Sequence, residues 1–381
     1  MQSRHESDPT HESPQVVDTP EYLSTLAAAL MKQPVVAVDT EANSLYAYHE
    51  QVCLIQISIP GVDYLVDPLA LEDLSPLAPL FASTEIEKIF HAADYDLMVL
   101  LRDFDFETRR IFDTMWAARI LGWPKVGLAD ILARHFDVKV NKRYQRYNWG
   151  KRPLEPEALR YAWMDSHYLL PLREIQKAEL EATGRWAEAR EVFAYLTSTV
   201  EVPDADTTDQ HFWRIKGAHD LDRDDLSVLY QLYLWREYVA EQMDRPPMKV
   251  ISNRRLLRLA RIRPRTRDEL AAAGLTPWQV RRFGPSLLKA LQAERFPTPP
   301  AQQFERRPPD HIMYRFKTLK AWRKEVARMR GVDSDVILPN ATLWELARHP
   351  PEDMSELLEV PGIGPWRQSA YGPDLLQLVA D

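Results

Sequence analysis

The sequence predicts an α/β domain, with a mixed β-sheet flanked by helices, followed by two small all-α domains. Short apolar and β-branched runs between residues 35 and 90 are separated by turn residues, which is the pattern of strands. From residue 95 to residue 198, apolar residues recur mainly at helical spacing. After residue 210, a set of landmark residues occurs twice in the same order, which indicates a repeated domain.

The strands are expected early in the chain and most helices later. Val35–Val38 leads into Asp39, and a turn at Pro60-Gly61-Val62-Asp63 separates Val52–Ile59 from Tyr64–Val66, so these three runs should form a β-meander. Ile86–Phe90 is a fourth short strand. Strands followed by helices predict a mixed sheet covered by helices. Helices are expected at Tyr95–Arg102, Thr114–Leu121, Leu128–Phe136, Glu155–Lys177 and Arg185–Leu196.

Four landmarks define the repeat: Trp-Arg, Asn, Pro-Trp and Gly-Pro. Trp and Asn are 18 residues apart in both copies, at Trp235 and Asn253 and again at Trp322 and Asn340. The next intervals are 24 and 25 residues, then 7 in both copies. We therefore expect a disordered leader at 1–18, the α/β domain at 19–200, a linker at 201–216, one helical domain at 217–296, a proline-rich linker at 297–308, and a second helical domain at 309–381.

The composition is that of a packed globular protein, with 45% hydrophobic and 27% charged residues in a chain of 381. The single cysteine, Cys53, excludes an intrachain disulfide and a cysteine-based metal site. No apolar run approaches the roughly 18 residues that would span a membrane, and the first 14 residues lack the apolar region of a signal peptide. We expect a cytoplasmic protein without a membrane partner, and a monomer.

The charge is unevenly distributed along the chain. The net charge is −8, yet residues 1–200 carry 20 basic and 30 acidic residues while the remainder carries 28 and 26. Within the second part, Arg245–Lys289 contains 12 basic and 2 acidic residues. Such a local excess can bind a polyanion although the whole chain is acidic. An ordinary solvated helical face is the alternative.

Three groups of polar residues are candidates for chemistry. Asp39 and Glu41 end a predicted strand, where alternation places both on one face, and paired carboxylates suit a hard divalent cation. The second group is the segment 91–97, His-Ala-Ala-Asp-Tyr-Asp-Leu. In the third, Tyr161 and Asp165 lie one turn apart on a largely apolar helix, where a carboxylate is costly unless paired or bound to metal. Each group alone also fits a structural role.

Taken in order, Asp-x-Glu, a downstream Asp and Tyr-x3-Asp resemble the DEDDy branch of the DEDD exonucleases, which implies an RNase H-like fold. The surrounding residues narrow the resemblance to the ribonuclease D family. They include Val38–Glu41, Leu54–Ile57, His91-Ala92, Phe112–Thr114, Trp149, Arg152–Leu154 and Tyr168–Pro171. The two helical repeats resemble HRDC domains, the helical module that helicases share with ribonuclease D.

This resemblance implies a 3′→5′ exoribonuclease that trims single-stranded RNA 3′ ends, as in tRNA precursors, and releases nucleoside 5′-monophosphates. Its cofactors would be two divalent ions, Mg²⁺ or Mn²⁺, held by Asp39, Glu41, Asp96 and Asp165, while Tyr161 would orient the attacking water. The family pattern places the third carboxylate five residues after the histidine, which favours Asp96 over Asp94. One departure is Tyr147-Asn148, where the family often has Ser-Asp before the tryptophan.

Two segments are candidates for RNA binding. Val138–Arg152 has six basic residues, no acidic residue and three interleaved aromatic residues, a combination that holds phosphates and stacks on bases. The other is the basic run that starts at Arg254 in the first repeat. Val360–Gly364 also resembles the hairpin of helix-hairpin-helix modules, although packing alone could explain its glycines. The candidate RNA-binding residues are Lys142, Arg143, Arg146, Trp149, Arg152, Arg254, Arg255 and Arg258.

Two other functions remain open at this point. The same carboxylates could serve a 3′→5′ exonuclease acting on DNA, and only the family resemblance of the repeats favours RNA. A non-catalytic nucleic-acid-binding protein on a nuclease scaffold is the other alternative, against which the complete set of four carboxylates and Tyr161 argues.

Overall fold

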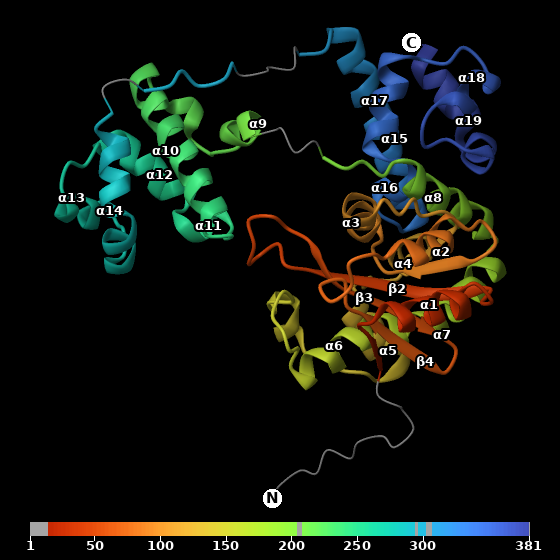
Figure 1. Cartoon of the computed structure of the whole chain (residues 1–381). Helices are drawn as coiled ribbons and strands as arrows, with labels where there is room; N and C mark the ends of the chain where they lie inside the picture. Colours follow the sequence, from red (N-terminus) through yellow and green to blue (C-terminus); the bar gives the residue numbers. More distant parts are fainter. Residues whose placement is uncertain (1–13, 204–207, 294–295, 302–306, 381) are drawn as a thin grey trace, which may run out of the picture. The chain divides into compact units, whose positions relative to one another are not determined.

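The computed structural model describes residues 14–203, 208–293, 296–301 and 307–380, and the chain divides into two compact units (Figure 1). The first unit contains Met1–Ala42, Val52–Val202 and Arg307–Asp381. The second contains Asn43–Gln51 and Pro203–Arg306. The second helical repeat therefore shares a compact unit with the α/β domain, whereas the first repeat belongs to the other unit.

The α/β domain is built on a mixed six-stranded sheet in the order β1-β4-β3-β2-β5-β6. The expected meander is confirmed, since β2, β3 and β4 pair antiparallel in succession. The pairs β1–β4, β2–β5 and β5–β6 are parallel. The strands are β1 (Gln15–Val17), β2 (Val35–Ala42), β3 (Val52–Ile59), β4 (Val62–Val66), β5 (Glu87–Phe90) and β6 (Ile111–Asp113).

Helices pack on this sheet, as the sequence predicted. Of these, α6 contacts β2, β3 and β4, α7 contacts β2 and β5, and α8 contacts β6. The main core consists of the apolar residues of strands and helices that face one another. The helices are α1 (Pro20–Leu30), α2 (Ala78–Ala82), α3 (Asp94–Phe104), α4 (Thr114–Ile120), α5 (Leu128–Phe136), α6 (Pro156–His167), α7 (Leu169–Ala182) and α8 (Trp186–Ser198), with 3₁₀ turns η1 (Ser75–Leu77) and η2 (Lys142–Arg146).

The expected disordered leader is wrong for its described part. Residues 1–13 lie outside the described residues, but Gln15–Val17 form β1, which pairs with β4 and buries Val17. Thr19 then caps α1, because its side chain accepts a hydrogen bond from the Tyr22 amide and Pro20 suits the first helical position. Three paired residues are too few to give a period-two pattern, so β1 left no signal in the sequence.

One long helix expected at Glu155–Lys177 is two helices, α6 and α7. Pro171 explains the break between them. A proline has no amide hydrogen to donate to the carbonyl of His167, four residues earlier, and its ring clashes with that carbonyl. The chain therefore ends α6 at His167 and begins α7 at Leu169.

Both repeats are all-helical. The first contains α10 (Arg223–Gln242), α11 (Pro247–Val250), α12 (Asn253–Ile262), α13 (Arg267–Ala272) and α14 (Pro277–Leu291), preceded by α9 (Thr208–Trp213) and the turn η3 (Ala218–Asp220). The second contains α15 (Asp310–Arg330), α16 (Ser334–Ile337), α17 (Asn340–Arg348), α18 (Met354–Glu359) and α19 (Pro365–Ala380). The linker expected at 201–216 ends too late, since Phe212 and Ile215 are buried in the core of the first repeat.

The Trp-Arg landmark has the same structural role in both repeats. Arg236 donates from Nη1 to the Ile251 carbonyl oxygen at 3.3 Å and to Oδ1 of Asn253 at 2.5 Å. Arg323 donates from Nη1 to the Leu338 carbonyl oxygen at 2.7 Å. Both arginines are buried, at 5% and 7% exposed. They tie the long helix of each repeat to the segment that leads into the helix beginning at the landmark asparagine.

Among the residues that the structure describes, no helix is both long and apolar enough to cross a membrane.

Candidate active site

Two elements bring three of the predicted carboxylates together. Asp39 and Glu41 lie near the end of β2, Asp165 lies on α6, and α6 packs on β2. One carboxylate oxygen from each of these three residues lies within 4.8 Å of the other two. Tyr161 lies one turn before Asp165 on α6, is 8% exposed, and lines the same cavity. The strand and helix periodicities thus place all four side chains in one site.

Asp96 and Asp94, the two candidates for the third position, have different surroundings. Both lie in the first turn of α3. Asp94 is exposed, whereas Asp96 is only 6% exposed and accepts a hydrogen bond from Oγ1 of Thr40 at 2.5 Å. The charge of Asp96 also contributes to the raised pKa of Asp39. These surroundings favour Asp96, although its carboxylate lies outside the group of three within 4.8 Å.

The electrostatics of this cluster are those of buried, mutually repelling acids. Burial, followed by the charges of the neighbouring carboxylates, raises the pKa of Asp39 and of Glu41 well above the ordinary values. Burial also raises the pKa of Asp96 and of Asp165 to about 7. The pKa of Tyr161 is raised as well, first by burial and then by the charge of Asp165. A bound cation would relieve this repulsion and favour the ionised forms.

The cluster opens into a cavity of about 490 Å³. Besides the predicted residues, its lining includes His91, Gln145 and the start of α5 at Gly127. In the sequence, His91 served only as a marker for the third carboxylate and Gly127 had no predicted role, whereas Gln145 lies within the segment Val138–Arg152 that was predicted to bind RNA. No local sequence motif predicts that Gly127 or Gln145 lines the cavity. They lie there because the chain between α4 and α6 passes beside the carboxylates.

The residues present fit divalent cations. The donors that converge are carboxylate oxygens, which are the ligands that Mg²⁺ and Mn²⁺ prefer. Burial raises the pKa of Asp39 and of Glu41 most, and the negative charges of the neighbouring carboxylates add to the shift. A cation at this position would supply the missing positive charge, so a metal centre accounts for an arrangement that costs stability without one.

We expect the thermal stabilisation by Mg²⁺ to grow between about pH 5 and pH 8. Burial raises the pKa of Asp96 and of Asp165 to about 7 in the folded protein, against about 4 in the unfolded chain. The metal-free fold therefore loses stability as the pH rises toward 7. Mg²⁺ binds the ionised forms and reverses that loss. Melting curves with Mg²⁺ or EDTA measure the gain. An equal gain at pH 5.5 and pH 8 would contradict this account of the cluster.

Some side chains of the basic segment Val138–Arg152 are not available for the RNA binding that its composition predicted. Trp149 is 2% exposed and packs at an edge angle on Tyr147, so its indole is not available to stack on a base in this structure. Arg143 and Arg146 are exposed on η2. The side chain of Lys142 lies outside the described residues.

Arg152 has a structural role, because its guanidinium is hydrogen-bonded within the protein. Its Nε and Nη2 donate to the two carboxylate oxygens of Asp67, both at 2.6 Å. Nη2 also donates to the Cys53 carbonyl oxygen, and Nη1 donates to the Trp149 and Lys151 carbonyl oxygens. With its donors used in this way, Arg152 fixes the loop to β3 and to the end of β4, and the prediction that it binds RNA does not fit this structure.

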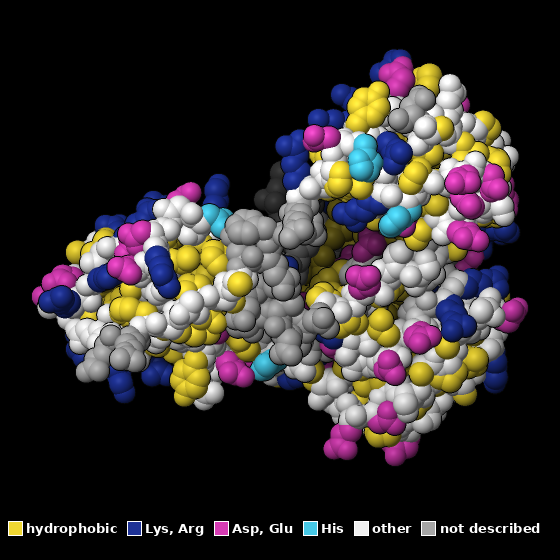
Figure 2. All heavy atoms as spheres, turned by 90° about the horizontal axis from the view of Figure 1, so that it is seen from above, with side chains coloured by type: hydrophobic (Ala, Val, Ile, Leu, Met, Phe, Trp, Pro, Cys, Tyr) yellow, Lys and Arg dark blue, Asp and Glu magenta, His cyan; other side chains and the backbone are white. Residues whose placement is uncertain are grey.

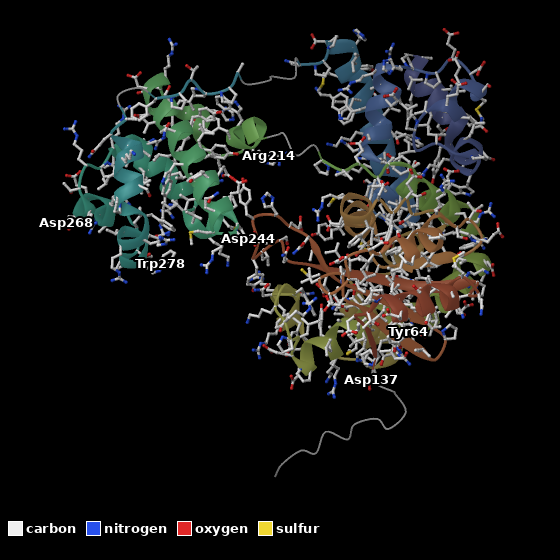
Figure 3. The ribbon with its side chains drawn as sticks, viewed as in Figure 1. Tyr64, Asp137, Arg214, Asp244, Asp268 and Trp278 are labelled. Carbon is white, nitrogen blue, oxygen red and sulfur yellow. The ribbon has the colours of Figure 1, made fainter. Side chains whose placement is uncertain are left out.

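In the first repeat, Arg254 and Arg258 are exposed, while Arg255 is half-buried and donates to Oε1 of Gln279. Trp278, labelled in Figure 3, is 44% exposed beside Phe283. Over the face seen in Figure 2, basic and acidic side chains are interspersed and form no single basic surface.

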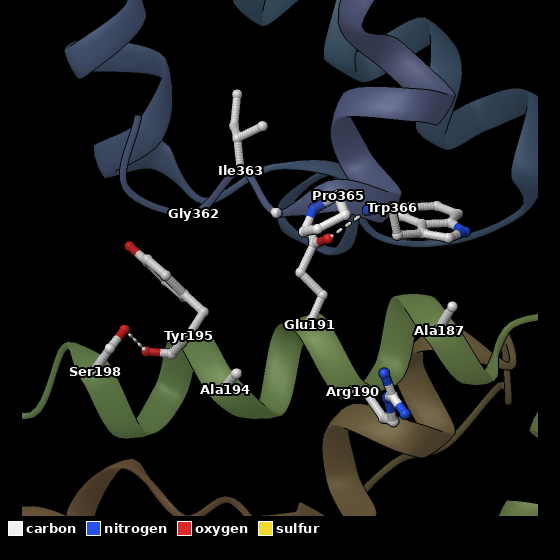
Figure 4. Close-up of a pocket in the computed structure, with 11 residues that line it drawn as sticks. Ala187, Arg190, Glu191, Ala194, Tyr195, Ser198, Gly362, Ile363, Pro365 and Trp366 are labelled. Carbon is white, nitrogen blue, oxygen red and sulfur yellow. Dashed lines mark hydrogen bonds between the residues drawn. The ribbon is translucent and has the colours of Figure 1, made fainter. Parts of the chain in front are cut away.

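The hairpin of the second repeat is occupied by a side chain of the α/β domain. Glu191 of α8 accepts hydrogen bonds at Oε2 from the amides of Trp366, at 2.9 Å, and Arg367, at 3.3 Å, in the first turn of α19 (Figure 4). A Cβ at Gly364 would clash with that oxygen. In helix-hairpin-helix modules, which this segment resembles, such backbone amides meet a phosphate. Here a carboxylate of the same chain accepts their hydrogen bonds, and Gly364 makes room for it.

Trp366 and Trp278 are the matching landmarks of the two repeats, but their helices begin differently. The helix of Trp278, α14, is capped within its own repeat, where Thr276 and Gln279 form a capping box. At the start of α19, the helix of Trp366, the backbone amide instead donates a hydrogen bond to the carboxylate of Glu191 from the α/β domain. The hairpin of the second repeat therefore packs against α8.

A buried ion pair extends this interface. Arg330 of α15 donates to both carboxylate oxygens of Glu188, each at 2.8 Å, and Glu188 is fully buried. The same arginine donates to the Tyr371 hydroxyl at 2.7 Å. Arg119 of α4 pairs with Asp335 of the second repeat. The second repeat thus contacts both α4 and α8.

Family comparisons agree with this architecture. A family model for a 3′-5′ exonuclease matches residues 14–181, and the HRDC domain model matches residues 225–291 and 314–379. A 3′→5′ exonuclease domain joined to two HRDC domains is therefore the class of protein that the fold and the site define.

Individual relatives identify the family. Ribonuclease D of Haemophilus influenzae is 32% identical over 319 residues, covering 82% of this chain and 79% of that protein. The crystal structure of Escherichia coli RNase D matches with a TM-score of 0.66 and 26% identity over 97% of this chain and 99% of that chain. The catalytic core of Trypanosoma brucei RRP6 matches with a TM-score of 0.65 and 30% identity over 75% and 80% of the two chains. The chain belongs to the ribonuclease D family, and it is a 3′→5′ exoribonuclease.

Proposed function

We propose that this exoribonuclease trims single-stranded 3′ ends of structured RNAs such as tRNA precursors by a two-metal-ion mechanism. The observation that carries the proposal is the convergence of Asp39, Glu41 and Asp165 in one cavity with Tyr161, with Asp96 close enough to act on Asp39. The structure of Escherichia coli RNase D is described as that of an exoribonuclease involved in structured RNA processing. That description supports the same substrate class for this relative.

Each residue has a definite role in the proposed reaction. Asp39, Glu41, Asp96 and Asp165 would hold two divalent ions, Mg²⁺ or Mn²⁺. When bound, such ions activate the attacking water and support the leaving 3′-oxygen. The water oxygen bonds to phosphorus, the bond from phosphorus to the 3′-oxygen of the preceding nucleotide breaks, and that oxygen gains a proton. The phosphate remains on the 5′ carbon of the released nucleotide, so the product is a nucleoside 5′-monophosphate.

Tyr161 would orient the water rather than remove its proton. The pKa of its hydroxyl is raised by burial and by Asp165, so the hydroxyl stays protonated at neutral pH and is a poor base. It can still accept a hydrogen bond from water while donating to a carboxylate. The short distance along α6 from Tyr161 to Asp165 fixes the hydroxyl beside the cluster.

A degradation assay tests the function. RNA and DNA oligonucleotides of the same sequence, labelled at the 5′ end, would be incubated with Mg²⁺, Mn²⁺ or EDTA. We expect a ladder of products shortened from the 3′ end of RNA, with no cleavage in EDTA. Faster cleavage of DNA than RNA would favour the alternative of a DNA exonuclease. Nucleoside 3′-monophosphates as products would contradict the proposed direction of attack.

We expect Tyr161→Phe to lower the single-turnover rate by roughly 100-fold, the lower range for a positioned group that assists proton transfer. RNA affinity should change little, because the hydroxyl acts on the water and the phenyl ring keeps its packing against Tyr144. Rates under single-turnover conditions and binding of uncleaved RNA in Ca²⁺ separate the two effects. A loss of affinity at an unchanged cleavage rate would show that Tyr161 binds RNA instead.

For RNA binding outside the active site, we propose Arg143 and Arg146 on η2 and Arg254 and Arg258 on α12, which are exposed. The double change Arg254→Ala and Arg258→Ala should flatten the slope of log affinity against log salt by roughly 0.7 for each phosphate that the variant no longer binds. A salt titration of binding to a tRNA-sized RNA measures this slope. Arg328→Ala in the second repeat, also exposed, is the matched control. If both variants show the same slope, Arg254 and Arg258 do not contact RNA phosphates.

A further inference from the structure

Two motifs of the α/β domain, His91-Ala92 and Phe112-Asp113-Thr114, form one hydrogen-bonded structure. Asp113 accepts from the Ala93 amide at 2.7 Å and from the Ala92 amide at 3.3 Å, which holds the turn after β5, where Ala92 has a φ of 64°. The same carboxylate caps α4. The turn that carries His91 is therefore rigidly attached to the start of α4, although the reaction proposed above gives His91 no role.

The hydrogen bonds of Thr114 determine the tautomer of His91. The Thr114 hydroxyl donates its one hydrogen to the Phe90 carbonyl oxygen at 3.0 Å, since a carbonyl only accepts. Its oxygen also lies 2.9 Å from Nδ1 of His91, so in that contact the imidazole must donate. Burial lowers the pKa of His91 to about 4, which keeps the ring neutral at pH 7. A neutral ring that carries its hydrogen on Nδ1 has a hydrogen-bond acceptor at Nε2.

This acceptor belongs to the active-site cavity. His91 lines the cavity together with Asp39, Glu41, Tyr161 and Asp165. Its Nδ1 faces Thr114, which is fully buried. With Nδ1 held against Thr114, Nε2 is the ring nitrogen left to face the cavity that His91 lines. An RNA end that enters the cavity meets a fixed, uncharged acceptor there.

The chemistry of an RNA 3′ end limits what can bind this nitrogen. Phosphate oxygens accept hydrogen bonds and cannot pair with Nε2. Exocyclic amino groups are donors, but only some bases carry them, and an exonuclease must accept every base in turn. The ribose hydroxyls are donors that all four nucleotides share, and the 2′-hydroxyl is also what distinguishes RNA from DNA.

We propose that Nε2 of His91 accepts a hydrogen bond from a ribose hydroxyl of the 3′-terminal nucleotide, and that Thr114 fixes the tautomer that makes this possible. The inference rests on the proposed function, because it requires the terminal nucleotide to occupy this cavity. It makes His91 a residue for substrate positioning and sugar recognition. The terminal hydroxyls are not reacting atoms, because the bond that breaks leads to the preceding nucleotide.

The test compares three substrates that differ only in the last sugar. One RNA oligonucleotide ends in ribose, one in 2′-deoxyribose and one in 3′-deoxyribose, and the first cleavage is followed under single-turnover conditions in Mg²⁺. We expect the wild-type protein to cleave one deoxy end roughly tenfold more slowly than the ribose end, as for the loss of one hydrogen bond. That end identifies which hydroxyl His91 contacts. Equal rates on all three ends would overturn the proposal.

Variants connect the effect to His91. His91→Phe should cleave the ribose end as slowly as the wild-type protein cleaves the sensitive deoxy end, and should no longer distinguish the two ends. If the variant keeps the wild-type ratio between ends, His91 is not the acceptor. Mg²⁺ should still raise its melting temperature, which shows that the carboxylate cluster is intact. If the wild-type protein cleaves no RNA at all, the proposed function fails instead, so the two failures are distinguishable.

Two variants of Thr114 provide a further test in case His91→Phe does not fold. Thr114→Ser keeps the hydroxyl and should keep the ratio between ends. Thr114→Val removes the acceptor for Nδ1, frees the ring to place its hydrogen on Nε2, and should reduce the ratio toward one. A Thr114→Val protein that retains the full ratio would contradict the assignment of the tautomer.

Discussion

Asp39→Asn is expected to abolish RNA cleavage while it stabilises the metal-free fold. Asparagine has nearly the shape of aspartate but lacks the charge that a divalent ion requires. The loss should be on the order of 1,000-fold or more in single-turnover rate, since metal-ion catalysis supplies several kcal/mol and each 1.36 kcal/mol is a factor of ten. In EDTA at pH 8, the melting temperature should rise, because one member of a mutually repelling buried cluster is neutralised.

Asp165→Asn should give the same two results, since its pKa is also raised by burial and its oxygen belongs to the same group. Asp94→Asn is the matched control, being an exposed aspartate two residues from Asp96 on α3. It should keep the wild-type rate. Cleavage of RNA by Asp39→Asn at a rate near wild type in saturating Mg²⁺ would mean that the metal assignment is wrong.

The active-site cluster could be predicted from sequence because each part follows from local periodicity. Strand alternation places Asp39 and Glu41 on one face, and a helical turn places Tyr161 beside Asp165. The packing of α6 on β2 depends on the tertiary structure, which local periodicity does not predict. It was expected only from the family resemblance. Composition was a poorer guide to the basic segment, because a list of residue types does not distinguish an arginine that faces RNA from Arg152, which is bonded to Asp67.

The two helical repeats differ in their relation to the α/β domain, and no sequence pattern predicted this difference. Their landmarks match closely, since these residues stabilise the inside of each repeat, as Arg236 and Arg323 do. Docking depends instead on Glu188 and Glu191, which lie on a helix of the other domain far away in the chain. On an amphipathic helix, glutamates usually face solvent. Only the tertiary structure shows that these two face the second repeat.

We expect Glu188→Ala and Arg330→Ala each to destabilise the first compact unit by about 3–5 kcal/mol, the cost of leaving one partner of a buried ion pair uncompensated. Glu188 is fully buried, and Arg330 contacts both of its oxygens. Urea unfolding of the full chain measures the change. Arg328→Ala is the control: Arg328 lies on the same helix and pairs with Glu325, but both side chains are mostly exposed, at 71% and 55%, so the unfolding midpoint should scarcely move.

The double variant decides whether the pair itself holds the second repeat in place. If Glu188 and Arg330 interact as the structure shows, removing both leaves no unpaired charge, and the double variant should be destabilised by clearly less than the sum of the single variants. Additive effects would show that the two side chains act independently. Because α8 also supplies Glu191 to the hairpin, deleting residues 307–381 should expose buried surface of α8 and destabilise the α/β domain itself. A truncated protein as stable as the full chain would contradict this docking.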